Sequence, residues 1–107
     1  MDKIRLSADG TLRLVGSRDQ ETGQTYFPYR PLAADGSLRP CEEVLLSGKG
    51  ALYSWTRFAK RFYGQIDLPE GVRVQCEIDD GPHEIGGIYR LEVIADGDDA
   101  TWRFRHD

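Results

Sequence analysis

The sequence predicts an all-β fold, in which a small closed barrel of five strands follows an N-terminal β-hairpin arm. From Val72 to Asp79, apolar residues alternate with polar ones, and this period of two is typical of a half-buried antiparallel strand. Turn sequences such as Pro69-Glu70-Gly71 separate the extended segments. No stretch shows sustained helical periodicity.

The N-terminal arm, residues 1–40, begins with two short alternating segments, Ile4 to Leu6 and Thr11 to Val15. The turn sequence Ala8-Asp9-Gly10 lies between them, so we expect a hairpin. A further extended piece is expected from Gln24 to Phe27, before a proline-punctuated loop. The arm has no core pattern of its own.

The barrel is expected to occupy residues 41–107, with strands near 44–58, 62–68, 72–79, 88–95 and 101–105. Gly48 and Gly50 interrupt the long first strand. Glycine permits the bend by which one strand pairs with neighbours on both sides, as in an oligonucleotide/oligosaccharide-binding (OB) barrel. An open sandwich is the alternative, because periodicity alone fits both. Leu91 and Val93 are predicted to point inward, and Trp102 and Phe104 to share one side.

The composition favours one small domain in a reducing compartment. The chain has 107 residues, a net charge of -4 and a pI near 5.1, which argues against nucleic-acid binding through bulk electrostatics. Cys41 and Cys76 lack metal-ligand spacing, and Cys76 falls on the apolar side of its strand, so both are predicted to be free thiols. No apolar leader or long apolar run occurs. We expect a cytoplasmic protein without a membrane segment.

No catalytic residues are predicted. Ser47 and Ser54 lack a G-x-S-x-G elbow, and Cys76 is expected in the core. His83 lies in a loop and is expected to be solvated, while His106 is close to the end. The turn carboxylates are also expected to be solvated, since they lack calcium-loop spacing: Asp79, Asp80, Asp96, Asp98 and Asp99.

Two long motifs resemble a known family. They run from Leu46 to Thr56 (LSGKGALYSWT) and from Tyr63 to Val74 (YGQIDLPEGVRV). Together with Gly16-Ser17-Arg18, Gly23, FPYRP at 27–31 and Gly36-Ser37, they closely resemble the acyl-CoA-associated OB-fold family, domain of unknown function 35 (DUF35), over about residues 12–105. The resemblance implies a rubredoxin-like zinc ribbon before the barrel. It also implies a small subunit paired with a thiolase-like enzyme, as in benzoylsuccinyl-CoA thiolase.

The chain departs from the family at the zinc ligands. Where the family usually has cysteines, this sequence has Asp19, Thr22, Ala33 and Asp35. A structural zinc site needs four thiolate or imidazole ligands. We therefore predict a degenerate, metal-free zinc-ribbon-like arm. Another metal on Asp19 and Asp35 is the alternative.

The function implied by the resemblance is that of a non-catalytic accessory subunit in a thiolase-like acyl-CoA-processing complex. The partner enzyme would supply the catalytic residues for carbon-carbon cleavage or formation on a ketoacyl-CoA. This chain would support the partner and shape its acyl-CoA entrance, binding no cofactor itself. The alternative is a single-stranded nucleic-acid-binding OB module.

Aromatic residues and cations alternate around the end of the first barrel strand. We identify six of them as candidate contacts for acyl-CoA or the partner: Tyr53, Trp55, Arg57, Lys60, Arg61 and Phe62. Cations suit nucleotide phosphates, and aromatic surface suits an acyl path. The same pattern is compatible with a stacking platform for nucleic acid, or with Tyr53, Trp55 and Phe62 in the barrel core.

Overall fold

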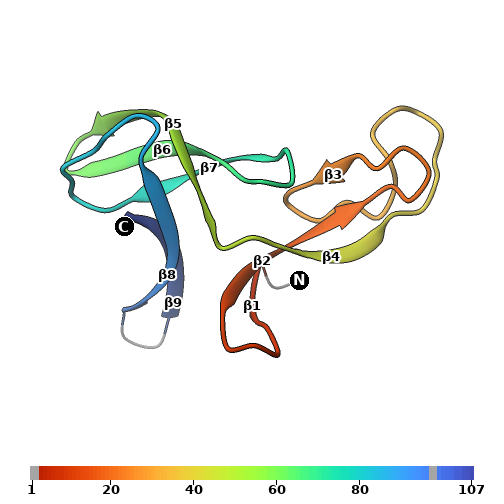
Figure 1. Cartoon of the computed structure of the whole chain (residues 1–107), viewed down its shortest axis with the longest axis horizontal. Coiled ribbons are helices and arrows are strands. Elements are labelled where there is room, and N and C mark those ends of the chain that lie inside the picture. Colours follow the sequence, from red (N-terminus) through yellow and green to blue (C-terminus); the bar gives the residue numbers. More distant parts are fainter. Residues whose placement is uncertain (1–2, 97–98) are drawn as a thin grey trace.

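Nine β-strands make up the part of the chain that the computed structural model describes, residues 3–96 and 99–107 (Figure 1). They are β1 (Ile4–Leu6), β2 (Leu12–Arg18), β3 (Thr25–Tyr26), β4 (Glu42–Leu46), β5 (Lys49–Phe58), β6 (Arg61–Asp67), β7 (Arg73–Ile78), β8 (Ile88–Asp96) and β9 (Asp99–His106). No helix occurs in these residues, as predicted. The predicted turn residues Gly97 and Asp98 lie outside the described part.

Strands β5 to β9 form a closed barrel in the order β5-β6-β7-β9-β8. The pairs are antiparallel except β7 with β9, which is parallel and joins Ile78 to Phe104. This arrangement confirms the predicted five-stranded OB-type barrel. Its interior holds fully buried side chains from the strands, including Leu52, Ile66, Val74, Ile78, Tyr89 and Phe104.

Strand β5 closes the barrel because it pairs on both sides. Its first residues, Lys49 to Ala51, pair with β8, and Ala51 to Phe58 pair with β6. The register shifts between Leu52 and Ser54, and a bulge of this kind bends a strand. Gly50 is needed for a close approach, since a Cβ there would lie 2.5 Å from the Asp67 carbonyl oxygen.

The predicted long first strand is two strands in two sheets. Residues 42–46 form β4, which pairs with β2 rather than with the barrel. The chain bends at Gly48, where a Cβ would stand 2.2 Å from the carbonyl oxygen of Leu12. Sequence periodicity missed this break because both strands are extended and only tertiary pairing separates them.

Strands β1 to β4 form a second sheet, here called the arm sheet, with β2 bonded to the other three (Figure 1). The predicted N-terminal hairpin is confirmed as β1–β2, and β3 falls within the extended piece expected before the prolines. Leu14 and Leu46 of this sheet belong to the same buried cluster as the barrel core. The arm is therefore stabilised by apolar contact with the barrel.

The β8–β9 hairpin extends beyond the barrel (Figure 1). Leu91 is buried as predicted, but Val93 is exposed, which corrects the expectation that both point into the core. Leu91 and Phe104 form a pair in the core, and Val93 pairs with Trp102 closer to the β8–β9 turn. Trp102 packs instead edge-on to Phe27 of the arm, with ring centroids 5.9 Å apart.

Candidate functional site

The β5–β6 hairpin carries the aromatic and cationic residues singled out in the sequence. Its ladder continues to the last pair, Phe58 with Arg61, and the turn contains Ala59 and Lys60. The hairpin ends at the left of Figure 1, whereas the loops before and after β3 of the arm sheet lie at the right. The structure brings the six candidate residues onto one hairpin, but in different environments.

The ring of Trp55 packs against two other aromatic rings. Trp55 lies opposite Gly64, where a Cβ would meet the side chains of Leu52 and Ile78. Its ring centroid is 5.9 Å from that of Phe62 and 5.0 Å from that of His83. Even so, 44% of the Trp55 surface is exposed. Trp55 is thus a fixed aromatic surface rather than core.

His83 lies beneath Trp55, which corrects its prediction as a solvated loop histidine. Its side chain is only 2% exposed, and its Nδ1 is 2.7 Å from the hydroxyl oxygen of Tyr89. Asp79, whose side chain is 16% exposed, has a carboxylate oxygen 3.9 Å from the same nitrogen. Nε2 of His83 has no hydrogen-bond partner among the described residues. The β7–β8 loop is folded under the aromatic residues of β5 and β6, which single-sequence periodicity does not reveal.

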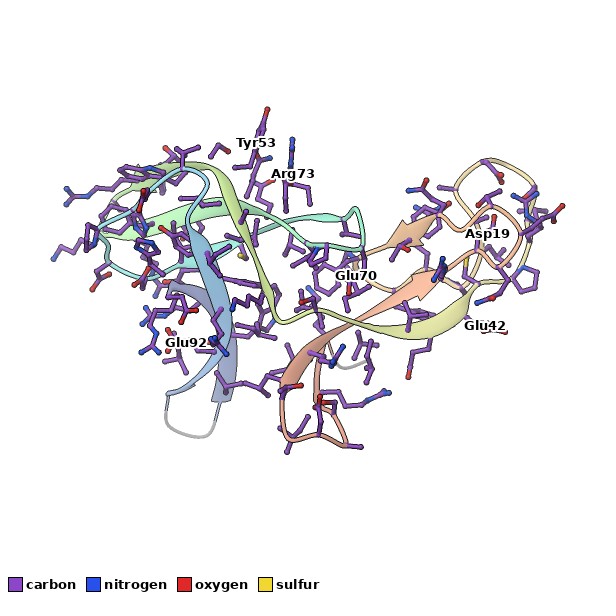
Figure 2. All side chains as sticks on the ribbon, viewed as in Figure 1. Asp19, Glu42, Tyr53, Glu70, Arg73 and Glu92 are labelled. Carbon is purple, nitrogen blue, oxygen red and sulfur yellow. The ribbon has the colours of Figure 1, made fainter. Side chains whose placement is uncertain are left out.

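Tyr53 pairs with an arginine that the sequence analysis did not select. The guanidinium carbon of Arg73 is 3.4 Å from the centre of the Tyr53 ring, and both side chains project together from the barrel (Figure 2). Arg73 also donates a hydrogen bond of 2.6 Å to Asp67. This bond raises the pKa of Arg73. One face of Tyr53 is therefore covered, and the charge beside it is balanced.

The three cations of the candidate set gather at the hairpin end. Arg57 donates to the carbonyl oxygen of Ala59 over 3.2 Å, and its guanidinium lies 5.8 Å from the centre of the Phe62 ring. Arg61 is 3.8 Å from Glu77 on β7. Within the described residues, the side chain of Lys60 makes no hydrogen bond or ion pair. Phe58, not selected as a candidate residue, stands among them with 74% of its surface exposed.

Cys76 is placed where the sequence predicted, facing the core from β7. It pairs with Gly64 and packs against the buried cluster. Burial raises the pKa of its thiol to about 12, so Cys76 stays protonated near neutral pH and is a poor nucleophile. Both cysteines are free, as expected.

Two of the four positions that replace cysteines in the arm, Asp19 and Asp35, are joined by the side chain of Arg39. Arg39 donates to both carboxylate oxygens of Asp19, and its Nη2 is 2.6 Å from Asp35. Thr22 donates to Asp19 over 3.0 Å. The described residues contain no group of three or more His, Cys, Asp or Glu side chains placed to hold a metal ion.

A zinc ion does not fit this arrangement. The guanidinium of Arg39 occupies the space between the two carboxylates, and a zinc site needs four ligands free of competing cations. Ala33 adds only a buried methyl group. The hydrogen bonds from Arg39 lower the pKa of Asp19, and those from Ser37 and Arg39 lower the pKa of Asp35. Both groups are therefore ionised partners of the arginine at neutral pH.

Comparisons with known proteins give matches in structure. No family model and no curated protein matches the sequence. The chain is similar to a solved structure named "Ltp2-ChsH2(DUF35) aldolase", with 20% sequence identity and a TM-score of 0.70 over 88% of this chain and 84% of that chain. The chain has the fold of the DUF35 proteins. A DUF35 protein of unknown function from Sulfolobus solfataricus is also similar, with 16% identity and a TM-score of 0.60 over 89% of this chain and 76% of that chain.

The DUF35 fold expected from the two sequence motifs is thus confirmed. The likeness covers both the arm sheet and the barrel, since it spans 88% of the chain. Within the described residues, no helix is long and apolar enough to cross a membrane.

Two residues outside the six candidate positions, Arg73 and Phe58, lie close to them. Arg73 could have been found, because the turn at 69–71 sets β6 against β7 and places Arg73 opposite Asp67. Phe58 lies inside the aromatic stretch of the sequence. The face of β5 on which its side chain lies could not be predicted, because the register shifts at the bulge between Leu52 and Ser54.

Proposed function

We propose that the chain is a non-catalytic accessory subunit of a thiolase-like acyl-CoA-processing complex. The observation that supports it is the shared fold with the ChsH2(DUF35) part of the "Ltp2-ChsH2(DUF35) aldolase", at a TM-score of 0.70. That structure combines a DUF35 protein with a second protein, Ltp2, under the name of an enzyme. In the proposed complex, a thiolase-like subunit breaks or forms the carbon-carbon bond of a ketoacyl-CoA.

The environments of the chain's own residues are compatible with a supporting role. The Cys76 thiol is turned into the core with a raised pKa, and His83 is enclosed by aromatic rings. Neither group is placed to attack or deprotonate a bound thioester, because a catalytic group must reach the reacting atom. The catalytic cysteine and bases are therefore assigned to the partner.

The acyl-CoA entrance is assigned to the face of the complex beside the β5–β6 hairpin. Here Trp55 offers an exposed ring on a fixed base, and Arg57, Lys60 and Arg61 supply positive charge. An aromatic wall suits an acyl or pantetheine chain, and the cations beside it suit either nucleotide phosphates or carboxylates of the partner enzyme. The chain alone holds no zinc in this proposal, and CoA enters as the partner's substrate.

The test is purification of the tagged chain from its native host, followed by mass spectrometry and activity assays. We expect a thiolase-like protein at fixed stoichiometry, with thiolysis or retro-aldol cleavage of a ketoacyl-CoA by the complex and none by the isolated chain. Turnover by the isolated chain would overturn the proposal, as would recovery without any acyl-CoA enzyme. A salt-sensitive complex with single-stranded DNA would favour the OB nucleic-acid alternative instead.

A further inference from the structure

The end of the β5–β6 hairpin, residues 57–61 and here called the hairpin tip, has an exposed apolar side chain at its centre. Phe58 exposes 74% of its surface, more than Leu38 at 69% or Leu6 at 64%. A phenylalanine in water gains free energy when another surface covers it. Five large apolar side chains are exposed along β5 and the segment next to it: Tyr53, Trp55, Phe58, Ile85 and Ile88. A single exposed apolar side chain is common, so the order and the charge of the hairpin tip must also be considered.

The hairpin tip is also hydrogen-bonded up to its turn. The β5–β6 ladder is paired up to Phe58 and Arg61, so the strands do not fray before the turn. Ala59 adopts a positive φ of 57°, which non-glycine residues rarely do, and Arg57 caps its carbonyl oxygen. A tip ordered in the free chain loses little conformational entropy when it binds.

Positive charge surrounds Phe58. Arg57, Lys60 and Arg61 lie within five residues in a chain of net charge -4, and a single acidic side chain, Glu77, is paired with them among the described residues. Apolar contact gives affinity at the centre of an interface, while complementary charge at the rim gives orientation and a faster association. The surface that matches the hairpin tip is an apolar socket bordered by carboxylates.

A protein fits this shape better than a nucleotide does. Small-molecule sites are concave, with volumes of roughly 300–1,000 Å³. A hollow on the same hairpin, lined by Thr56, Tyr63 and Gln65 among others, measures about 140 Å³. The tip itself is a projecting turn (Figure 1).

We infer that the hairpin tip docks into the catalytic subunit, with Phe58 filling an apolar socket and Arg57, Lys60 and Arg61 meeting carboxylates at its border. This inference rests on the proposed function. It names one surface of this chain and the chemistry of the surface that receives it.

The experiment uses the catalytic subunit that the host purification identifies, produced recombinantly, and measures its dissociation constant for variants of this chain by calorimetry. Phe58→Ala should weaken binding about thirtyfold, as expected for a buried aromatic anchor. The double variant Lys60→Glu/Arg61→Glu should also weaken binding to the catalytic subunit, and by a larger factor at low salt than at high salt. The matched control is Leu38→Ala, an equally exposed apolar residue in the arm, which should bind as the parent chain does.

Each outcome separates the two proposals. Unchanged affinity of Phe58→Ala, with the parent chain binding tightly, would overturn the docking inference and leave the accessory role intact. If the variants bind normally but raise KM for the acyl-CoA, the tip contacts substrate and the inference is wrong. If no acyl-CoA enzyme binds the parent chain, the proposed function itself fails. The circular dichroism and Tm of Phe58→Ala should match the parent chain, because its side chain is exposed.

Discussion

Two side-chain nitrogens of Arg39 donate hydrogen bonds to the carboxylate of Asp19, with Nη2 at 2.7 Å and Nε at 3.1 Å from Oδ2. Asp19 is buried, at 1% exposure, although it lies near the far end of the arm sheet (Figure 2). The same guanidinium reaches Asp35, so it ties the loop after β2 to the loop that precedes Arg39. A buried carboxylate is tolerated only when paired and hydrogen-bonded. The arginine thus links two loops that the resemblance assigns to metal ligands.

Removing this link should destabilise the arm. We expect Arg39→Met to lower the Tm markedly, because it leaves the Asp19 charge buried with fewer partners. Arg39→Lys should lower the Tm less than Arg39→Met does, since a lysine keeps the positive charge but cannot donate two hydrogen bonds from one planar group. Thermal unfolding followed by circular dichroism measures both, with exposed Lys60→Met as the control. An unchanged Tm for Arg39→Met would show that the link does not stabilise the arm.

A related expectation concerns metal. If Arg39 takes the place of a metal ion, the purified chain should contain no stoichiometric zinc, and EDTA should leave its Tm unchanged. Elemental analysis of protein purified without a histidine tag measures the first point. About one zinc per chain would mean that the ligands lie elsewhere.

The arm should also lose stability in acid. The pKa of Asp19 and Asp35 is lowered in the folded chain, whereas an unfolded aspartate titrates near 3.9. A lowered folded pKa gives a stabilisation that is complete above the unfolded pKa and is lost as the pH falls through the folded one. The urea midpoint should therefore fall below about pH 4. The urea midpoint of Asp19→Asn should be lower than that of the parent chain at pH 6 and should change less with pH. If the midpoints of the two proteins fall in parallel as the pH is lowered, Asp19 is not the cause of the acid sensitivity.

Strand patterns in the sequence predicted the barrel strands, and Gly48 and Gly50 favoured a barrel over an open sandwich, but neither signal shows which segments lie next to each other in space. The alternation of Val74 and Ile78 with polar residues reports a buried face directly. Gly48 indicated a bend, but the separation of β4 and β5 into two sheets depends on the backbone of Leu12, which crosses close to Gly48. His83 was misjudged for a similar reason. A loop histidine is usually solvated, and only the fold places it under Trp55.

The crossing at Gly48 gives a test of how the arm joins the barrel. Gly48→Ala should destabilise the chain by about 1–3 kcal/mol, the usual cost of overpacking, because its Cβ would press on the Leu12 carbonyl at 2.2 Å. Thr56→Ala on β5 is the control, since Thr56 is exposed and the change should stay within about 0.5 kcal/mol. Urea unfolding compares the two. Equal stabilities would mean that the arm is not packed against β5 as described.

Cys76 offers a chemical test of the barrel interior. In a Cys41→Ser background, Cys76 is the remaining thiol, and its pKa is raised to about 12 by burial. Because the thiolate is the reactive species, the native chain should resist iodoacetamide at pH 8, and the rate should rise by orders of magnitude in guanidinium chloride. Mass spectrometry counts the labelled chains. Rapid labelling of the native chain would place Cys76 on an accessible surface and would reopen the question of a nucleophile in this subunit.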